Sequence, residues 1–188
     1  MTKVCVRASH KPRVGSEEAQ AVNLRHEIKQ ARPFSSGEEE AVLNIFRTSD
    51  CLQREFQRRT RDWGISSPQY NVLRILRGAH PQSLTCSEIG ARMITADPDI
   101  TRLLARLKVN KLIRQHRDRN DRRVVRTQIS EAGMDLLLQM DPLIQCMPKE
   151  LLGRLNREEV AQLTRLLELA RANCADRRLS PKCDGNGE

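Results

Sequence analysis

The feature that most restricts what this chain can fold into is a change of hydrophobic period near residue 112. Before it, apolar residues recur at the spacing of one helical face, as in Ile100, Leu103, Leu104 and Leu107. After it, apolar and polar residues alternate as they do in a strand, as in Val125, Thr127 and Ile129. Turn-forming residue types fill positions 118–121. Residues 112–129 are therefore predicted to form a β-hairpin directly after a helix.

Three short helices with recognisable first turns are predicted before this hairpin. Ser67 is expected to cap the first helix, with Pro68 at the first helical position. Thr85 begins a capping box at the start of the second helix, and Asp97 is expected to cap the third. Short polar turns between helices of this length are typical of a helix-turn-helix. With the hairpin as its wing, residues 65–129 are predicted to be a winged helix-turn-helix DNA-binding domain.

A long helix is predicted on the N-terminal side of this domain. Residues 1–34 are expected to be a polar extension, helical in part, and residues 35–64 a dimerisation helix that ends at Gly64. Two serine–glutamate pairs fit a capping box at its start, Ser35 with Glu38 and Ser36 with Glu39.

The C-terminal flank, residues 130–176, is predicted to contain further dimerisation helices. Ser130 is the expected first cap, and Pro142 and Pro148 are expected to kink or divide the helical stretch. Asn156, with Glu159 three residues later, is expected to open the last helix. Residues 177–188 are expected to be a disordered tail. The flanking helices carry more apolar surface than a DNA-reading module needs, and a second subunit would cover it. The predicted fold class is mainly α with a small β-hairpin wing, flanked by N- and C-terminal dimerisation helices.

The positive charge of the chain is concentrated in this predicted domain. The net charge is +9, and residues 96–126 alone contain ten basic and four acidic side chains. Such a balance favours a polyanionic partner, nucleic acid first and an anionic membrane surface second. Every aromatic residue lies before residue 71, so bases have no aromatic ring to stack on in the basic stretch. We therefore expect double-stranded DNA as the partner.

Several other chemistries find no support in the sequence. No segment of 18 uncharged apolar residues could span a membrane, and the basic N-terminus lacks the apolar core of a secretory signal, so a cytoplasmic protein is expected. The six cysteines form no Cys-x-x-Cys pair and the four histidines are dispersed, although distant residues can converge on a metal. No phosphate-binding glycine loop or nucleophile elbow occurs. We expect no enzyme, no cofactor and no metal.

The helix that precedes the hairpin has the residue pattern of a DNA-recognition helix. The face opposite its leucines carries polar and guanidinium side chains: Asp99, Thr101, Arg102 and Arg106. Arginine can bond bidentately to guanine in the major groove, and threonine can contact a thymine methyl group or a phosphate. The starts of three helices are expected to present backbone N–H groups to phosphates, and the candidate residues there, besides Asp97, are Ser67, Thr85 and Ser87.

The hairpin is rich in arginine, which suits a narrow minor groove. The candidates for contact with DNA are Arg119, Arg122 and Arg123, with further arginines at 114, 117 and 126. A carboxylate beside them, Asp121, is expected to hold one guanidinium in a fixed rotamer through a charge-assisted hydrogen bond.

Four segments together resemble the MarR family (multiple antibiotic resistance regulators): SPQYNVLRILRGA, TCSEIGARM, DPDITRLLARL and DRRVVRTQISEAG. The resemblance covers about residues 42–170. It implies a triangular homodimer that binds palindromic sites and usually represses neighbouring genes. It also implies release by small phenolic or other aromatic ligands or by cysteine oxidation. By position, Asp121 matches the family's orienting aspartate and Arg123 its minor-groove arginine, while Asp99, Thr101 and Arg102 fall where bases are read.

The chain departs from the family pattern at the end of the recognition helix. A glycine usually stands just before the Leu-Ile pair, whereas here Asn110 and Lys111 precede Leu112. Asparagine tolerates the left-handed conformation, so a cap shifted to Asn110 is expected.

The effector side of the resemblance points to a pocket between the dimerisation helices and the DNA-reading lobe. It would involve Phe46, Arg47, Trp63 and Tyr70, for which a role in the core is the alternative. Cys86, next to a helix cap, and Cys51 are candidate redox sensors, with an inert buried thiol as the alternative. Two other functions remain open: a metal-sensing winged-helix regulator and a non-specific architectural DNA-binding protein.

Overall fold

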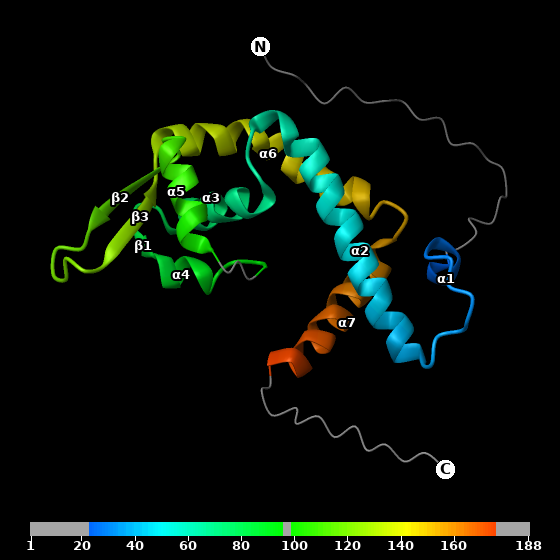
Figure 1. The fold of residues 1–188 in the computed structure, drawn as a ribbon. Coiled ribbons are helices and arrows are strands. Elements are labelled where there is room, and N and C mark those ends of the chain that lie inside the picture. Colours follow the sequence, from blue (N-terminus) through cyan, green and yellow to red (C-terminus); the bar gives the residue numbers. More distant parts are fainter. Residues whose placement is uncertain (1–22, 96–98, 176–188) are drawn as a thin grey trace. The chain divides into compact units, whose positions relative to one another are not determined.

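The computed structural model describes residues 23–95 and 99–175, drawn as ribbons in Figure 1. The chain divides into two compact units, one ending at Pro142 and the other beginning at Leu143. The first unit holds all the strands and most of the helices, and α6 (Glu131–Leu151) begins in it and ends in the second unit. The predicted class, mainly α with a β-hairpin wing, is confirmed.

The first helices described in the first unit are the short helix α1 (Leu24–Glu27) and the long helix α2 (Gly37–Thr60). Ser36 is the cap of α2 and accepts a hydrogen bond from the backbone N–H of Glu39 at 3.2 Å. The Glu39 carboxylate accepts from the backbone and hydroxyl of Ser35, each at 2.6 Å, so the two serines share the cap. After the 3-10 turn η1 (Arg61–Trp63), Gly64 ends the helix with φ 66°, as predicted.

The next helix, α3 (Ser67–Ala79), begins one residue earlier than predicted. Ser66 and not Ser67 is the cap, and the prediction was wrong for an identifiable reason. The Ser66 hydroxyl accepts from the backbone N–H of Gln69 at 3.4 Å, and the Gln69 side chain accepts from the Ser66 backbone at 2.8 Å. A capping box needs a glutamine or glutamate three residues after the cap, which Ser66 has, whereas Tyr70 follows Ser67 at that distance.

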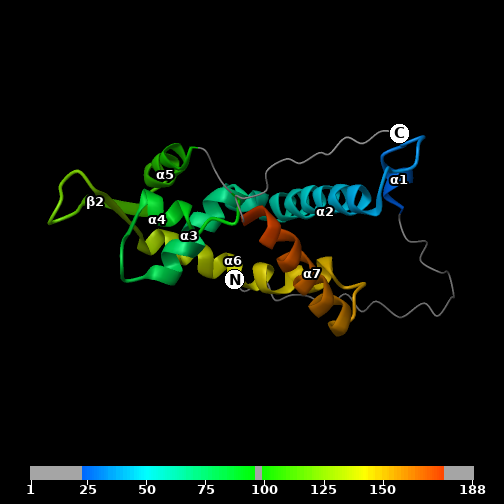
Figure 2. The same cartoon turned by 90° about the horizontal axis from the view of Figure 1, so that it is seen from below.

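A three-stranded antiparallel sheet of order β1-β3-β2 packs against α3. The predicted hairpin is confirmed as β2 (Ile113–Arg117) and β3 (Val125–Ile129), paired from Ile113 with Ile129 to Arg117 with Val125. It projects away from the helices in both Figure 1 and Figure 2. The two-residue strand β1 (Leu84–Thr85), which pairs with the other edge of β3, was not predicted because two residues are too few for an alternating pattern.

Two helices precede the hairpin and carry the helix-turn-helix. Thr85 caps α4 (Cys86–Gly90) in the predicted capping box with Glu88, whose carboxylate accepts from the Thr85 backbone at 2.7 Å. The following helix, α5 (Ile100–Val109), is capped by Asp99, which accepts from the Arg102 backbone N–H at 3.0 Å. A cap at Asp97 is therefore wrong for this helix, because the last carboxylate before its first turn takes that role; Asp97 itself lies outside the described residues.

Helix α5 ends in two reverse hydrogen bonds closed by a residue in the left-handed conformation. The backbone N–H of Lys111 donates to Lys108 at 2.9 Å, and that of Leu112 donates to Leu107 at 3.0 Å, the Schellman pattern. The left-handed residue is Lys111, with φ 59°, whereas Asn110 has φ −75°. The prediction that Asn110 takes this conformation was therefore wrong. The burial of Leu107 fixes where the two closing hydrogen bonds form. The position of these bonds determines that Lys111, and not Asn110, is the left-handed residue.

Replacing Lys111 with glycine is expected to stabilise the fold. A side chain beyond Cα costs roughly 1 kcal/mol in the left-handed conformation, and glycine removes that cost. Lys111→Ala is the matched control, because it also removes the charge and the long side chain but keeps Cβ. Urea unfolding should show a free energy of unfolding higher by about 1 kcal/mol for Lys111→Gly than for Lys111→Ala. Equal values for the two variants would contradict the backbone origin of the strain.

Helix α6 begins against the end of α5 in a contact that only glycine allows. The Ser130 hydroxyl accepts from the backbone N–H of Gly133 at 3.1 Å, as the predicted cap requires, and donates to the carbonyl of Lys111 at 2.7 Å. A Cβ at Gly133 would overlap the carbonyl oxygen of Leu112 and lie 2.8 Å from Cγ1 of Ile129. The first turn of α6 is thereby pressed onto both the end of α5 and strand β3.

Gly133→Ala is expected to destabilise the protein by about 3 kcal/mol, because a backbone oxygen cannot move aside without displacing Leu112 and β2. Gly78→Ala in α3 is the matched control. A Cβ there meets nothing within 4 Å, so the helix should gain about 0.5–1 kcal/mol. Thermal and urea unfolding of both variants measure the difference. Equal stability of Gly133→Ala and the parent chain would show that this contact is looser than described.

Farther along α6, an ion pair joins it to α3 within the first unit. Arg77 Nη1 donates to both carboxylate oxygens of Asp141 at 2.9 Å, and both side chains are partly buried. The helix then continues through Pro142 and Pro148 to Leu151, so of the two predicted effects of these prolines, a kink or a division, the division is wrong. A proline removes one N–H donor and strains one turn, and the turns on both sides are long enough to hold the helix.

The second unit contains α7 (Arg157–Ala175). As predicted, Asn156 and Glu159 form its cap: the Asn156 side chain accepts from the Glu159 backbone at 3.0 Å, and the Glu159 carboxylate accepts from the Asn156 backbone at 2.7 Å. Several leucines of α7 remain exposed, namely Leu163, Leu166 and Leu169. Within the described ranges, no helix combines the length and apolar character needed to cross a bilayer.

Candidate nucleic-acid interface

Helix α5 divides into an inner apolar face and an outer polar face. The inner face consists of Leu103, Leu104 and Leu107, which are all buried. Four side chains at helical spacing are exposed on the outer face: Thr101, Arg102, Ala105 and Arg106. Because the leucines fix the rotation of the helix, the two guanidinium groups are held outward on the same side. This is the arrangement that the sequence predicts for a helix that enters a major groove.

Asp99 lies at the start of α5, where the sequence places a base-reading residue. Its carboxylate accepts a hydrogen bond from the backbone N–H of Arg102 and thereby caps the N-terminus of α5. A carboxylate at a helix N-terminus also suits the positive end of the helix dipole. The structure therefore shows a capping role for Asp99 that the sequence interpretation assigned to Asp97.

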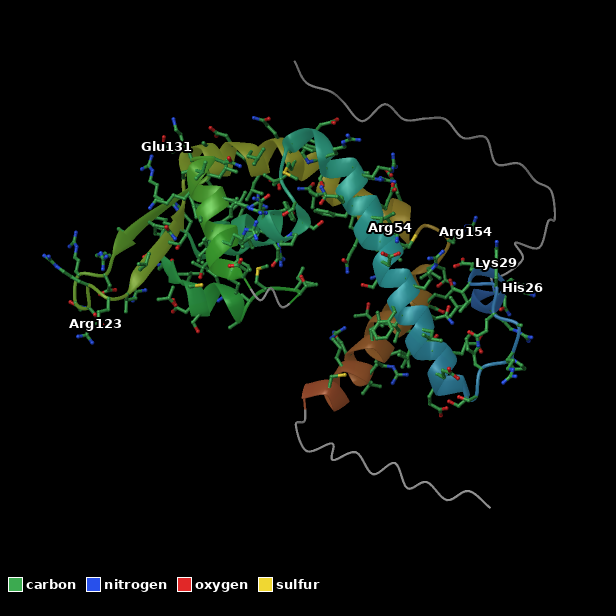
Figure 3. The ribbon with its side chains drawn as sticks, in the orientation of Figure 1. His26, Lys29, Arg54, Arg123, Glu131 and Arg154 are labelled. Carbon is green, nitrogen blue, oxygen red and sulfur yellow. The ribbon has the colours of Figure 1, made fainter. Side chains whose placement is uncertain are left out.

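The tip of the hairpin carries the predicted arginines at its outer end. Arg119, Arg122 and Arg123 are all exposed, and Figure 3 shows Arg123 at the far end of the loop between β2 and β3. A side chain of strand β2 holds the backbone of the tip, because Arg117 Nη1 donates a hydrogen bond to the carbonyl of Arg122 at 2.6 Å. Three cationic side chains are thus presented on a short loop whose base is braced.

The carboxylate that organises this tip is Asp118, which the sequence interpretation did not single out. Asp118 Oδ1 accepts from the backbone N–H groups of Asn120 at 2.8 Å and Asp121 at 3.3 Å, while Oδ2 accepts from the Nε of Arg126. The Arg126 guanidinium beside it lowers the pKa of the Asp118 carboxyl to about 2, with help from the two backbone donors. The available signal was the aspartate followed by turn residues, which is typical of an Asx turn.

Asp121 has a different role from the one expected. Its Oδ1 accepts from the backbone N–H of Arg123 at 2.9 Å, and among the described side chains no guanidinium pairs with it. It therefore shapes the main chain of the tip instead of fixing an arginine rotamer. Arg126, counted among the wing arginines in the sequence, faces Asp118 and also donates to the carbonyl of Ser83 at 3.4 Å.

The predicted phosphate-contacting residues lie at the starts of α3 and α4. The backbone N–H of Ser67 donates to Oε1 of Gln57 at 3.3 Å. The Thr85 hydroxyl accepts from the Glu88 backbone at 3.2 Å, and Ser87 is exposed in the first turn of α4. The Thr85 hydroxyl oxygen thus already accepts one hydrogen bond within the protein, and Ser87 is the more exposed of the two.

Sequence reasoning did not identify the surface hollows of the first unit. One, of about 400 Å³, lies beside α5 and is lined by Gln69, Arg102, Ala105, Arg106, Val109 and Asn110. Another, of about 340 Å³, lies near the start of α2 and is lined by Asn23, Arg25, Pro33, Phe34, Ser36, Gly37 and Glu40. Arg102 and Arg106 of α5 therefore border the concave surface of the 400 Å³ hollow.

The four candidate effector-pocket residues occupy different environments. Tyr70 is buried and its ring lies 5.3 Å from that of Phe56, between ring centroids, and burial raises the pKa of its hydroxyl. Phe46 is 66% exposed, and Arg47 forms a 3.0 Å ion pair with Glu27. Phe46 precedes Phe56 by ten residues on α2, roughly 15 Å along the helix. Trp63 is partly exposed. Neither of the two hollows contains any of the four.

The candidate redox cysteines are both unpaired thiols. Cys51 is exposed on α2, and Cys86 is partly buried in the first turn of α4. Within residues 23–95 and 99–175, no three histidine, cysteine, aspartate or glutamate side chains gather as a metal site would require.

A basic hairpin beside a helix-turn-helix with an outward arginine face defines a winged helix-turn-helix DNA-binding protein. The model of the MarR family matches residues 63–124. The HTH-type transcriptional regulator MhqR of Bacillus subtilis (strain 168) is 30% identical over 105 residues, which cover 56% of this chain and 71% of MhqR. The chain therefore belongs to the MarR family of transcription regulators, which bind DNA and are not enzymes.

Solved structures agree with this assignment. A MarR transcription factor from Planctomyces limnophilus is 36% identical, with a TM-score of 0.55, and the match covers 73% of this chain and 99% of that one. A mutant MarR from E. coli, crystallised with operator DNA, is 25% identical, with a TM-score of 0.62, and the match covers 67% of this chain and 89% of that one.

Proposed function

We propose that this protein is a homodimeric repressor that recognises a palindromic operator, with α5 in the major groove and the β2–β3 hairpin in the adjacent minor groove. The observation that carries the proposal is the outward arginine face of α5, fixed by the buried leucines Leu103, Leu104 and Leu107. The operator complex of the related E. coli MarR supports DNA reading by this fold. In this proposal residues 65–129 read DNA, and residues 35–64 and 130–176 form the dimer.

Each groove is assigned the residues whose chemistry fits it. Arg102 and Arg106 reach guanine edges, and Thr101 contacts a thymine methyl group or a phosphate, with Asp99 at the start of the helix. Arg119, Arg122 and Arg123 enter the minor groove, where narrow A·T-rich sequence deepens the negative potential. Ser67, Thr85 and Ser87 lie at helix starts suited to phosphate contacts. These contacts place the two half-sites about one helical turn, roughly 10 bp, apart.

Exposed apolar residues support the dimer. In α2 they are Val42, Ile45 and Phe46, at the spacing of one helical face, and in α7 they are Leu163, Leu166 and Leu169. Large apolar side chains left in water on two long helices favour burial against a second copy. Because two copies related by a two-fold axis present two identical reading lobes, a palindromic operator follows from the dimer.

The release of DNA is assigned to a small aromatic ligand or an oxidant. The ligand would bind near Phe46, Arg47, Trp63 and Tyr70. The three aromatic side chains of this set can stack on an aromatic ligand, and the arginine can attract a negative charge on it. Oxidation would act on Cys51, which is exposed, or on Cys86, which is partly buried beside the Thr85 cap. Among the described residues, only the fold favours a metal sensor.

Selection of bound fragments from a random duplex library is expected to enrich an inverted repeat. Fluorescence anisotropy should then show Arg123→Ala weakening binding to that operator by about 1–3 kcal/mol. Lys29→Ala provides a control, because it removes the same charge from an exposed side chain outside residues 35–176, to which the proposal assigns DNA reading and dimerisation. Tight binding at low salt with no enriched sequence would instead identify an architectural DNA-binding protein. Unchanged affinity of Arg123→Ala would remove the wing tip from the interface.

Sedimentation velocity is expected to show a dimer at micromolar concentration. Leu166→Glu places a charge on the exposed apolar face of α7 and should weaken the dimer by about 2 kcal/mol or more. Ala161→Glu adds the same charge to another face of that helix and should leave the dimer intact. A monomeric parent chain would exclude the two-lobed reading of a palindrome. Equal effects of the two variants would move the interface away from the leucines of α7.

A further inference from the structure

The wing tip is a compact turn in which one carboxylate bonds to three donors. Asp118 binds the backbone N–H groups of Asn120 and Asp121 with one oxygen and Arg126 with the other. Its own backbone N–H donates to the carbonyl of Val124 at 2.9 Å, across the neck of the loop. The Asp118 side chain is 15% exposed, whereas Arg119, Arg122 and Arg123 around it are exposed. The turn therefore has a fixed centre and a cationic rim.

Arg126 connects this centre to the helix-turn-helix. It lies in the middle strand of the sheet, opposite His116 on one side and Thr85 on the other. Besides Asp118, it binds the carbonyl of Ser83, directly before β1. Asp118 raises the pKa of the Arg126 guanidinium, and the negative charge of Glu88 adds a smaller contribution. Thr85 and Glu88 form the cap of α4. The Arg126 guanidinium, which binds Asp118 in the wing tip, therefore also interacts with the segment that begins this helix.

We propose that Asp118 and Arg126 are positioning residues of the DNA interface, which hold the wing-tip arginines in the conformation that reads the minor groove without themselves touching DNA. This inference rests on the proposed function, in which the wing enters that groove. Two N–H donors of Arg126, one on Nε and one on Nη1, are used within the protein, and these two bonds fix the orientation of its guanidinium. A loop with a fixed backbone loses less conformational entropy when its arginines bind.

The negative charge of Asp118 allows a positioning role to be distinguished from a purely electrostatic effect on DNA binding. Asp118 carries a negative charge in a surface that is proposed to face phosphates. If its only effect were electrostatic, Asp118→Asn would strengthen binding to every duplex. A positioning role predicts the opposite for the operator, because the loop would lose its ion pair with Arg126, while binding to random duplex would be unchanged or stronger. The ratio of the two affinities therefore decides between the roles.

The test measures binding of the full chain to the selected operator and to a random duplex of equal length, by anisotropy at several salt concentrations. For Asp118→Asn and Arg126→Gln, the ratio of operator to random affinity should fall about tenfold, the size of a lost base contact. Asp135→Asn, which removes an exposed carboxylate from α6, should leave the ratio unchanged. The double variant should lose no more than either single variant, since both break the same pair.

Two further readouts exclude a general loss of structure. Unfolding temperatures should stay near that of the parent chain, and the salt dependence on random duplex should not change for Arg126→Gln, whereas a lost phosphate contact would reduce its slope by about one. The Asp118 carboxyl, followed by NMR, should titrate near 2 in the parent and higher in Arg126→Gln.

The possible outcomes point to different failures. If the parent chain prefers no operator, the proposed function fails and this inference fails with it. If the parent is selective and Asp118→Asn is equally selective, the positioning role is wrong and the proposed function stands. A reduced salt slope for Arg126→Gln would make Arg126 a phosphate contact and would also overturn the inference.

Discussion

The DNA-reading unit depends on the burial of α3. Val72, Leu73 and Leu76 have no exposed surface, and this helix packs against α2, α4, α5 and β3. Each such side chain contributes about 1.5–3 kcal/mol when fully buried. Because α3 occupies the centre, α5 packs its leucines on one side and leaves Thr101, Arg102 and Arg106 exposed on the other. The orientation of the arginines on α5 is thus a consequence of apolar packing that involves no arginine.

Local chemistry made part of the fold predictable. The capping boxes at Thr85 and Asn156 were found because hydroxyl or amide and carboxylate stand three residues apart, and the bonds between them need nothing from the rest of the protein. The hairpin was predictable because its alternation and its turn residues agree. The same rule failed at Ser66, where glutamine and not glutamate completes the box and a neighbouring serine next to a proline offered a stronger signal.

What the sequence could not show are features set by contact between distant segments. The strand β1 exists because β3 offers it an edge, and the strained conformation of Lys111 is selected by where Leu107 is buried. The role of Asp118 depends on Arg126, eight residues away, which only the pairing of the strands brings alongside. In the same way, the bond of Asp121 to a backbone N–H, where a guanidinium partner was expected, is decided by the course of the loop.

The wing shows why net charge is a poor guide to which residues read DNA. Six arginines belong to the hairpin region, yet two are engaged within the protein: Arg117 supports the carbonyl of Arg122, and Arg126 is held by Asp118. Charge attracts the duplex regardless of sequence, while selectivity requires a side chain to meet its base from a defined position. An arginine that fixes the loop keeps its positive charge, but its particular contribution is to determine what its neighbours can reach. The basic composition of residues 96–126 thus contains two kinds of arginine, and only their hydrogen-bond partners tell them apart.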